Sequence, residues 1–521
     1  MTVKQSLSAL YYLLISTAIT STLAVLEHFK IFATCGLMGL GYFESCWVQD
    51  VQSRVFSTLG QPNWLAALVV ILLPISWLYS FKNKWYILLS VLFFVTLLFT
   101  KSRSGLLAFG IEFVIFFTLM FWKEKSKIVK EFLILLFTFI VIYFAINPPH
   151  ITNNPLETTS VGPALEVGGT ESGTIRKYVW TGAINIFKNY PLLGSGPETF
   201  AYTFPKHKPI EHNLTSEWDF IYNKAHNEYL NYLANTGILG LISYLVLIIV
   251  STVVIYKSKN IALLAGYFSI LVTNFFGFSV VAVSLLFFIF PAMAIVTSSP
   301  EAVQRKKQKL NTSQMILTAF VVIAITFSLY FILGYWRSDV HYNSARNYNR
   351  EKNRELALVE ITKALKYTPN EPLYMAEKAL ANLSINDAVV ALDANPYNQN
   401  VRNILISNLN LLASQNKEYL LVAEEIALTG SQIAPTNPKS FYQLGILNLK
   451  NGKLDEGLEN LERAVILKPN YKEGRFALGL TYIDIQDYEN AKEHLEYILN
   501  NIDPNDELIK KYLDQSISAS K

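Results

Sequence analysis

The chain has 521 residues, of which 51% are hydrophobic and only 16% are charged, and its mean hydropathy is +0.28. Soluble domains carry about 25% charged residues, so this composition excludes an ordinary soluble protein and indicates a membrane protein. The formal net charge of +4 is too small to indicate a nucleic-acid partner, and the positions of the basic residues are more informative than their sum. The apolar runs lie in residues 1–334, whereas residues 335–521 have the composition of a soluble helical domain.

Nine apolar segments of the first part approach the length that crosses a bilayer, which is roughly 17–25 residues. We expect spans at residues 7–25, 61–80, 85–101, 104–122, 130–146, 237–256, 261–276, 279–299 and 314–334. The first is placed like a signal peptide, but it lacks a convincing small-residue cleavage site and other spans follow it. The sequence therefore predicts an all-α, polytopic transmembrane helix bundle of about nine spans over residues 1–334.

Basic residues in the short connections predict how the bundle is oriented, because Lys and Arg concentrate on the cytoplasmic side. They gather at residues 81–84, 123–130, 257–259 and 304–309. Nine spans place these four connections on one side, together with Lys4. We therefore expect a cytoplasmic N-terminus. The stretches expected outside are residues 26–60, 102–103, 147–236 and everything after 335.

Cys35 and Cys46 are the two cysteines of the chain, and both lie in the first connection that is expected outside. Disulfides form in that compartment. Their separation of eleven residues permits a bridge, and it is equally compatible with two unpaired thiols in or near the membrane. The sequence leaves both alternatives open.

The loop at residues 147–236 is the longest connection of the membrane part. It begins with a stretch rich in Pro, Gly, Ser, Thr and Asn, and residues 174–190 then place apolar side chains at helical spacing. Gly194 and Gly196 follow, either as a turn that packs the loop on the membrane domain or as a nest of N–H groups for an anion. The last part, KAHNEYLNYLANTGILGL at 224–241, is expected to run as a helix straight into the sixth span.

The tail repeats itself with a period of 34 residues. The pair Leu444-Gly445 recurs as Leu478-Gly479, and more degenerate units precede these two. This pattern resembles the tetratricopeptide repeat, a helix–turn–helix unit with small residues where the two helices touch. One such unit cannot bury its apolar face alone, so we expect an extracytoplasmic α-solenoid over residues 335–521. Its concave surface is expected to bind a peptide, a glycan or a protein partner, with a scaffold that has no specific ligand as the alternative.

Four segments, in this order, resemble the signature region of the O-antigen ligase superfamily. They are RVFSTLGQPNWLAALVV at 54–70, TKSRSGLLAF at 100–109, IRKYVWTGAINIFKNYPLLGSGPETF at 175–200 and AHNEYLNYLANTGILGLISYL at 225–245. The resemblance covers roughly residues 50–300. Members of this family move a glycan from a polyprenyl pyrophosphate carrier to an acceptor outside the cytoplasmic membrane. They usually carry more spans before the signature region, and simple lipopolysaccharide ligases lack the ninth span and the repeat tail.

The resemblance implies that Arg103 and Arg176 contact the carrier pyrophosphate and that His226 activates the acceptor hydroxyl. Arginine suits the first task because it stays charged and binds phosphate oxygens in a bidentate fork. Histidine suits the second because its unperturbed pKa of about 6.5 lets it accept a proton near neutrality. A metal ion would need a carboxylate cluster, and no cluster of convincing spacing is present, so we expect a metal-independent enzyme without a cofactor.

Each candidate has a structural alternative. Arg103 could be a snorkelling interface residue, Arg176 an exposed helix residue and His226 an interface histidine. Arg54 either assists the carrier phosphate or forms a salt bridge with Asp50.

The neighbours of His226 give a further expectation. If this residue opens a helix, Tyr229 and Leu230 at i+3 and i+4 share its face and position it. His207 and His212 are weaker catalytic candidates, because they lie in an irregular polar segment of the same loop.

The expected function is therefore a multi-pass glycan transferase of the bacterial cytoplasmic membrane, of the O-antigen ligase or polysaccharide polymerase type. Its expected partners are a polyprenyl pyrophosphate-linked glycan, a glycan, lipid or protein acceptor, membrane lipids and a protein on the repeats. The alternative is an inactive, membrane-anchored repeat scaffold for envelope assembly. A transporter is disfavoured because most ionisable residues lie at span ends, although Glu112 lies within a span without an explanation.

Overall fold

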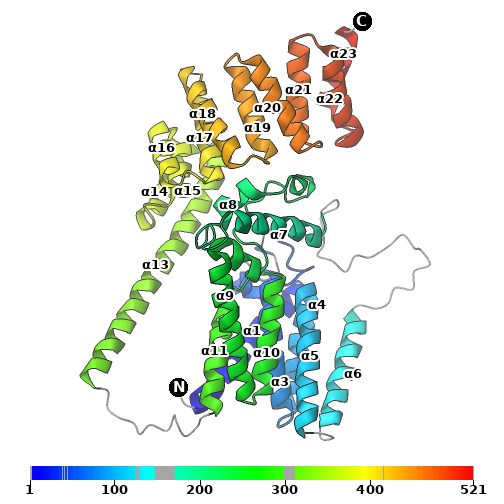
Figure 1. The fold of residues 1–521 in the computed structure, drawn as a ribbon, viewed down its shortest axis with the longest axis vertical. Coiled ribbons are helices and arrows are strands. Elements are labelled where there is room, and N and C mark those ends of the chain that lie inside the picture. Colours follow the sequence, from blue (N-terminus) through cyan, green and yellow to red (C-terminus); the bar gives the residue numbers. More distant parts are fainter. Residues whose placement is uncertain are drawn as a thin grey trace, which may run out of the picture. The chain divides into compact units, whose positions relative to one another are not determined.

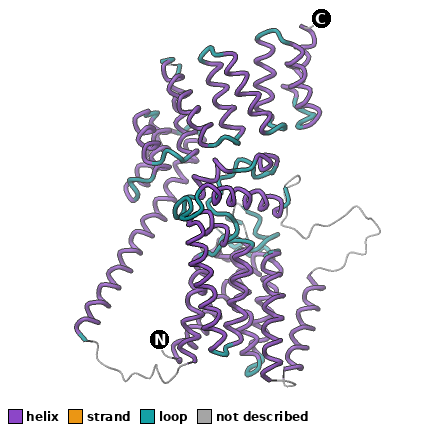
Figure 2. Tube along the Cα trace, viewed as in Figure 1, coloured by secondary structure: helices purple, strands orange, loops and turns teal. Residues whose placement is uncertain are grey.

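The computed structural model describes residues 3–519 except 38, 40, 44, 48, 125–127, 147–169, 299–310 and 415. The basic residues at 304–309 and the loop sequence at 147–169 therefore lie outside the described residues. The secondary-structure elements of the described residues are all helices, which confirms the predicted all-α class (Figure 1, Figure 2). The chain divides into two compact units. The first comprises Met1–Arg176, Phe187–Glu198 and Asn223–Lys307, and the second comprises Lys177–Ile186, Thr199–Tyr222 and Gln308–Lys521.

The first unit is a bundle of apolar helices. They are α1 (Val3–His28), α3 (Pro62–Ser80), α4 (Trp85–Phe99), α5 (Arg103–Glu124), α6 (Val129–Ile146), α9 (Glu228–Lys257), α10 (Ile261–Phe275) and α11 (Val281–Ser298). Together with α13 (Thr312–Arg350) of the second unit, they coincide with the nine predicted spans. Seven of the nine are long and apolar enough to cross a membrane, whereas α4 and α10 have 15 residues each. The side on which each connection lies stays a prediction.

Helix α3 forms the centre of this bundle, because it is buried on nearly all sides and packs against α4, α5 and α10. A helix that is apolar all round is expected in such a position. Trp77, fully buried near its end, packs against the edges of Phe109 and Phe113 of α5. Pro62 begins the helix, where its missing N–H costs no hydrogen bond. This start places Gln61 and Asn63 at one end of the bundle.

A disulfide between Cys35 and Cys46 closes the connection between α1 and α3, which answers the question that the sequence left open. Cys35 is buried and packs with Val51 and Phe56. The N–H of Val55 donates to the carbonyl of Phe99 at the end of α4 (3.2 Å). These contacts fix the connection beside the turn between α4 and α5.

Helix α9 bends at Gly237, whose φ of 64° and ψ of −165° are not helical, so the expected straight run into the span is wrong. The bend releases backbone groups that a continuous helix would pair. The turn before α8 pairs them instead: the N–H of Ile238 donates to the carbonyl of Pro191 (2.9 Å), and the carbonyl of Ala234 accepts from the N–H of Ser195 (3.0 Å). The loop is thereby attached to the start of the span.

The glycine-rich turn is a packing turn and not an anion nest. Gly194 and Gly196 both have positive φ, 70° and 119°. The N–H of Gly194 donates to the carbonyl of Tyr190 (3.1 Å), and the N–H of Gly196 donates to the carbonyl of Asn235 (3.0 Å). Between them, the N–H of Ser195 donates to the carbonyl of Ala234 (3.0 Å). Three consecutive N–H groups are therefore occupied by protein carbonyls.

We expect Gly194→Ala and Gly237→Ala to destabilise the protein. A Cβ on Gly194 would lie 2.3 Å from the backbone of Asn235, and a Cβ on Gly237 would lie 2.3 Å from the carbonyl oxygen of Leu192. Backbone cannot move aside as a flexible side chain can, and both glycines have positive φ, so each change should cost more than about 1 kcal/mol. Thermal unfolding of the purified protein measures it.

Gly110→Ala is the matched control, because a Cβ there meets no atom within 4 Å. Equal unfolding temperatures for all three variants would contradict the close approach of the two backbones.

The second unit contains the repeat helices. They are α13, α14 (Arg354–Tyr367), α15 (Pro372–Asn382), α16 (Ile385–Ala394), α17 (Gln399–Leu412), α18 (Glu418–Ile433), α19 (Pro438–Lys450), α20 (Leu454–Leu467), α21 (Lys472–Asp484), α22 (Tyr488–Asn501) and α23 (Glu507–Ala519). Consecutive helices pack in pairs, as the repeat pattern predicts (Figure 1). The recurring glycines lie where the paired helices touch, because a Cβ on Gly445 would lie 2.8 Å from Leu461 and one on Gly479 would lie 2.9 Å from Leu495.

Helix α13 continues without a break from its apolar part into the first repeat pair, where Ala345 is fully buried. The change of composition near residue 334 therefore falls inside one helix. The second unit also contains the middle of α7 (Ser172–Asn189), together with α8 (Phe200–His207) and the short helix η3 (Ile210–Leu214), which come from the long loop.

Candidate active site

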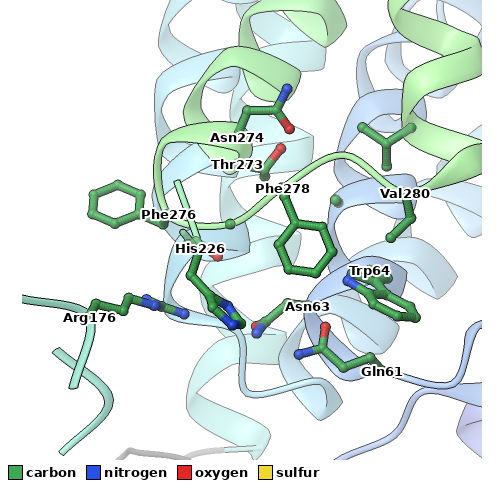
Figure 3. Close-up of a pocket in the computed structure, with 14 residues that line it drawn as sticks. Gln61, Asn63, Trp64, Arg176, His226, Thr273, Asn274, Phe276, Phe278 and Val280 are labelled. Atoms are coloured by element: carbon green, nitrogen blue, oxygen red, sulfur yellow. The ribbon is translucent and has the colours of Figure 1, made fainter. Parts of the chain in front are cut away.

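A cavity with polar and apolar lining residues lies in the first unit, at the end of the bundle where α3, α5 and α9 begin and α10 ends (Figure 3). Five parts of the chain contribute polar residues to it: Gln61 and Asn63, Ser104, Arg176, His226, and Thr273 with Asn274. Trp64 and Phe278 supply aromatic rings. Two of the four residues that the sequence selected, Arg176 and His226, line this cavity.

His226 precedes α9 and does not belong to it. Its φ of +52° is left-handed, and Asn227 caps the helix by accepting the N–H of Leu230 (3.0 Å). The expectation that Tyr229 and Leu230 share a helical face with His226 is therefore wrong. A left-handed backbone is uncommon for residues other than glycine, although histidine adopts it more often than most.

The backbone on both sides of His226 is fixed by Asn231. The side-chain oxygen of Asn231 accepts the N–H of Ala225 (3.3 Å), and its own N–H donates to the carbonyl of Asn227 (2.8 Å). Ala225 and Asn227 are both buried. The imidazole is thus held in the cavity by its buried neighbours.

His226 lies against an aromatic ring and near a cation. The ring of Phe278 meets it edge-on, with 5.4 Å between the ring centroids. In Figure 3, Arg176 reaches towards the imidazole from α7, and Asn63 lies on the other side of the ring. Burial and, second, the charge of Arg176 lower the pKa of His226 to about 4. The imidazole is therefore neutral at pH 7 and able to accept a proton.

Arg54 lies within electrostatic range of Arg176. Its Nε donates to the carbonyl of Thr100 (3.1 Å), and burial followed by the charge of Arg176 lowers the pKa of its guanidinium. The structure gives no ion pair between Arg54 and Asp50, both of which it describes. The carboxylate of Asp50 accepts backbone N–H groups of its own turn instead, such as that of Ser53 (3.1 Å). The alternative prediction, a salt bridge between Arg54 and Asp50, is therefore wrong.

Arg103 begins α5, next to the cavity residue Ser104. Its Nη1 pairs with the carboxylate of Glu171 (2.9 Å), and both side chains are more than half exposed, at 58% and 61%. Exposed ion pairs contribute little stability, so this pair can exchange for a stronger anion. The predicted pyrophosphate contact of Arg103 stays a prediction.

His207 and His212 belong to the second unit. His212 is fully buried and packs edge-on against Phe204 and Tyr222. Burial and the nearby Lys208 lower its pKa to about 4. This position is that of a core histidine.

Several residues of the cavity are absent from the candidates that the sequence suggested. Asn63 accepts a hydrogen bond from Ser102 (2.8 Å), and Asn274 accepts one from Ser279 (2.9 Å). The Oε1 of Gln61 is buried and accepts no hydrogen bond from any residue that the structure describes. A signal for Gln61 and Asn63 was present in the Gln-Pro-Asn turn at 61–63, whereas nothing in the sequence pattern marked the end of α10.

Residues 88–245 match the family model described as O-antigen ligase, and residues 473–498 match that of the tetratricopeptide repeat. No curated protein matches the chain. Among solved structures, a thermophilic TPR protein of Thermus thermophilus is 18% identical, with 35% of this chain and 99% of that one covered and a TM-score of 0.30. MamA of Desulfovibrio magneticus RS-1 is 19% identical, with 33% and 97% covered and a TM-score of 0.28. YrrB, a TPR protein with an unusual peptide-binding site, is 19% identical, with 34% and 90% covered and a TM-score of 0.27.

Proposed function

We propose that this chain, which carries an O-antigen ligase domain and tetratricopeptide repeats, is a membrane glycan transferase that uses a polyprenyl pyrophosphate-linked saccharide as its donor. The saccharide is transferred to a hydroxyl of a glycan, lipid or protein acceptor. The observation that carries the proposal is the presence of Arg176 and His226 in one cavity at the end of the bundle.

Arg176 and Arg54 are proposed to bind the pyrophosphate. As the bond between the anomeric carbon and the phosphate oxygen breaks, the electron pair stays on the pyrophosphate and its negative charge grows. Guanidinium groups aimed at that charge stabilise the transition state more than the ground state. Arg176 is close enough to Arg54 to lower its pKa, so the two cations repel, and an anion between them relieves this repulsion.

His226 is proposed to be the general base. Its imidazole takes the proton of the acceptor hydroxyl while the oxygen of that hydroxyl attacks the anomeric carbon from the face opposite the pyrophosphate, which inverts the configuration. A pKa of about 4 keeps the imidazole unprotonated before the substrates bind. An anion beside Arg176 offsets the cation that lowers this pKa, so donor binding should make His226 a stronger base.

The remaining polar residues of the cavity are proposed to contact the sugar at the bond that breaks. Gln61 lines the cavity, and a side-chain amide both donates to and accepts from the hydroxyls of a sugar. Asn63 can both donate and accept hydrogen bonds. Phe278 and Trp64 form an aromatic wall, with ring centroids 6.2 Å apart.

The site is proposed to face the outside of a bacterial cytoplasmic membrane. Lys82 and Lys84 follow α3, Lys123 lies in the last turn of α5, and Lys257 ends α9 with Lys259 following it. Since the cavity lies where these helices begin, the lysines lie at the opposite end of the bundle, which the positive-inside rule assigns to the cytoplasm.

Purified protein supplied with a polyprenyl pyrophosphate-linked oligosaccharide and an acceptor should release polyprenyl pyrophosphate and form transferred glycan. Because arginines are proposed to neutralise the pyrophosphate, we expect the rate to persist in the chelator EDTA. Thin-layer chromatography of the lipid and mass spectrometry of the glycan measure both products.

A strain that lacks the chain should lose a surface glycan. An unchanged surface glycan, together with no transfer in vitro, would favour the inactive repeat scaffold.

A further inference from the structure

A segment of the long loop, residues 199–222, packs within the second unit on the turns between repeats. Asn213, which is fully buried, donates from Nδ2 to the carbonyls of Thr436 (2.7 Å) and Leu467 (3.1 Å). Lys468 donates from Nζ to the carbonyl of Asn213 (2.8 Å). The carbonyl of Leu467 belongs to the last turn of α20 and has no partner within its helix. The loop segment therefore satisfies backbone groups that the repeats leave open.

Further contacts fix the same segment. Lys439 forms an ion pair with Asp219 (2.8 Å). The ring of Trp218 packs edge-on against Tyr471, with 5.5 Å between centroids, and lies below the ammonium of Lys468 at 5.0 Å. The turns between these repeats are therefore bound by a segment of the same chain, residues 199–222.

These contacts leave a pocket between the segment and the starts of α17 and α19. From the segment, Trp218 and Phe220 line it, and Phe220 is 62% exposed. From the start of α17, Gln399, Asn400 and Asn403 line it. The Nε2 of Gln399 is buried and donates no hydrogen bond within the described part of the chain. Asn400 of the same lining is exposed, so its side-chain amide is open to a ligand that brings hydrogen-bonding groups of its own.

We propose that this pocket binds a saccharide, as a second glycan subsite apart from the cavity around His226; the choice of ligand class rests on the proposed function. Sugar rings present C–H faces that pack on aromatic rings and hydroxyls that both donate and accept hydrogen bonds. The side-chain amides of Asn and Gln match such hydroxyls, because each has two donors and an acceptor. The lining has three charged residues: Asp219 and Lys439 pair with each other, and the Nζ of Lys208 donates to the carbonyl of Trp218 (3.0 Å). Each charged side chain of the pocket therefore already has a protein partner, which suits an uncharged ligand.

A direct binding test uses the full-length protein in detergent and oligosaccharides released by partial acid hydrolysis of the producing strain's own surface polysaccharide. Isothermal titration calorimetry should detect binding to the wild type. Phe220→Ala and Asn403→Ala should each weaken it at least tenfold. Tyr202→Ala, an exposed aromatic of the same segment outside the pocket, should leave it unchanged.

His226→Ala should bind these oligosaccharides as the wild type does, so the affinity of the subsite is measured independently of transfer. If the wild type binds these oligosaccharides but shows no transfer, the proposed function fails while the subsite stands; normal transfer by His226→Ala would contradict only the role of His226 as the base. In the transfer assay, a raised KM for the donor in Phe220→Ala would identify the donor glycan as the occupant, and a raised KM for the acceptor would identify the acceptor glycan. Equal affinities of all variants at equal unfolding temperatures, or no binding by the wild type, would overturn the proposal.

Discussion

Replacing His226 with alanine should lower the rate of glycan transfer by about 10²- to 10⁴-fold, the range that a positioned general base contributes. The change removes the proposed acceptor of the hydroxyl proton from a cavity that also contains Arg176. It should leave the helices in place, because the neighbours that fix this backbone do so through Ala225, Asn227 and Asn231. Single-turnover rates at saturating donor measure the loss.

His28→Ala is the matched control, since His28 lies in the same unit and stacks on Phe99 outside the cavity. A normal rate in His226→Ala, or an equal loss in His28→Ala, would contradict the assignment of His226 as the base.

The pH profile separates the base from a residue that only shapes the cavity. A base must be unprotonated, so kcat/KM should fall as the pH drops through the pKa of His226 in the free enzyme, which is about 4. Donor binding beside Arg176 should raise that pKa, so the acid limb of kcat should lie at a higher pH than the limb of kcat/KM.

The parts of the fold that follow from local pattern could be predicted from the sequence. The nine apolar segments became nine helices, and the 34-residue period placed Gly445 and Gly479 where paired helices touch. The bend at Gly237 could not be predicted in this way, because the apolar pattern runs through it unbroken. The bend depends on Pro191 and Ser195, which lie some forty residues away in the chain and pair with the released backbone.

The same distinction applies to the site. The order of motifs selected Arg176 and His226, but the motif spacing does not predict the left-handed backbone of His226 or the bond that the Asn231 side chain accepts from the N–H of Ala225. Thr273 and Asn274 reach the cavity only because α10 ends beside the start of α9. Arg54 illustrates the limit of reading charges along the chain, since its guanidinium bonds the carbonyl of Thr100, 46 residues on, and not the nearby Asp50.

Replacing Arg176 with alanine should lower transfer by about 10²- to 10³-fold, as expected for the loss of a donor that stabilises charge in the transition state. Arg176→Lys should restore only part of the rate, because a lysine keeps the charge but cannot form the bidentate fork on phosphate oxygens. Initial rates with varied donor at fixed acceptor give kcat and KM for each variant.

Lys177→Ala serves as the control for this prediction, because the next residue of α7 points about 100° away around the helix. It should transfer at the wild-type rate, and an equal loss there would mean that a general positive charge, and not Arg176, attracts the donor.

The Arg176→Ala variant also tests how Arg176 and His226 are coupled. Since Arg176 lowers the pKa of His226, its removal should raise that pKa and move the acid limb of kcat/KM to higher pH. A loss of rate with an unmoved limb would place Arg176 too far from the imidazole for both to act on one donor.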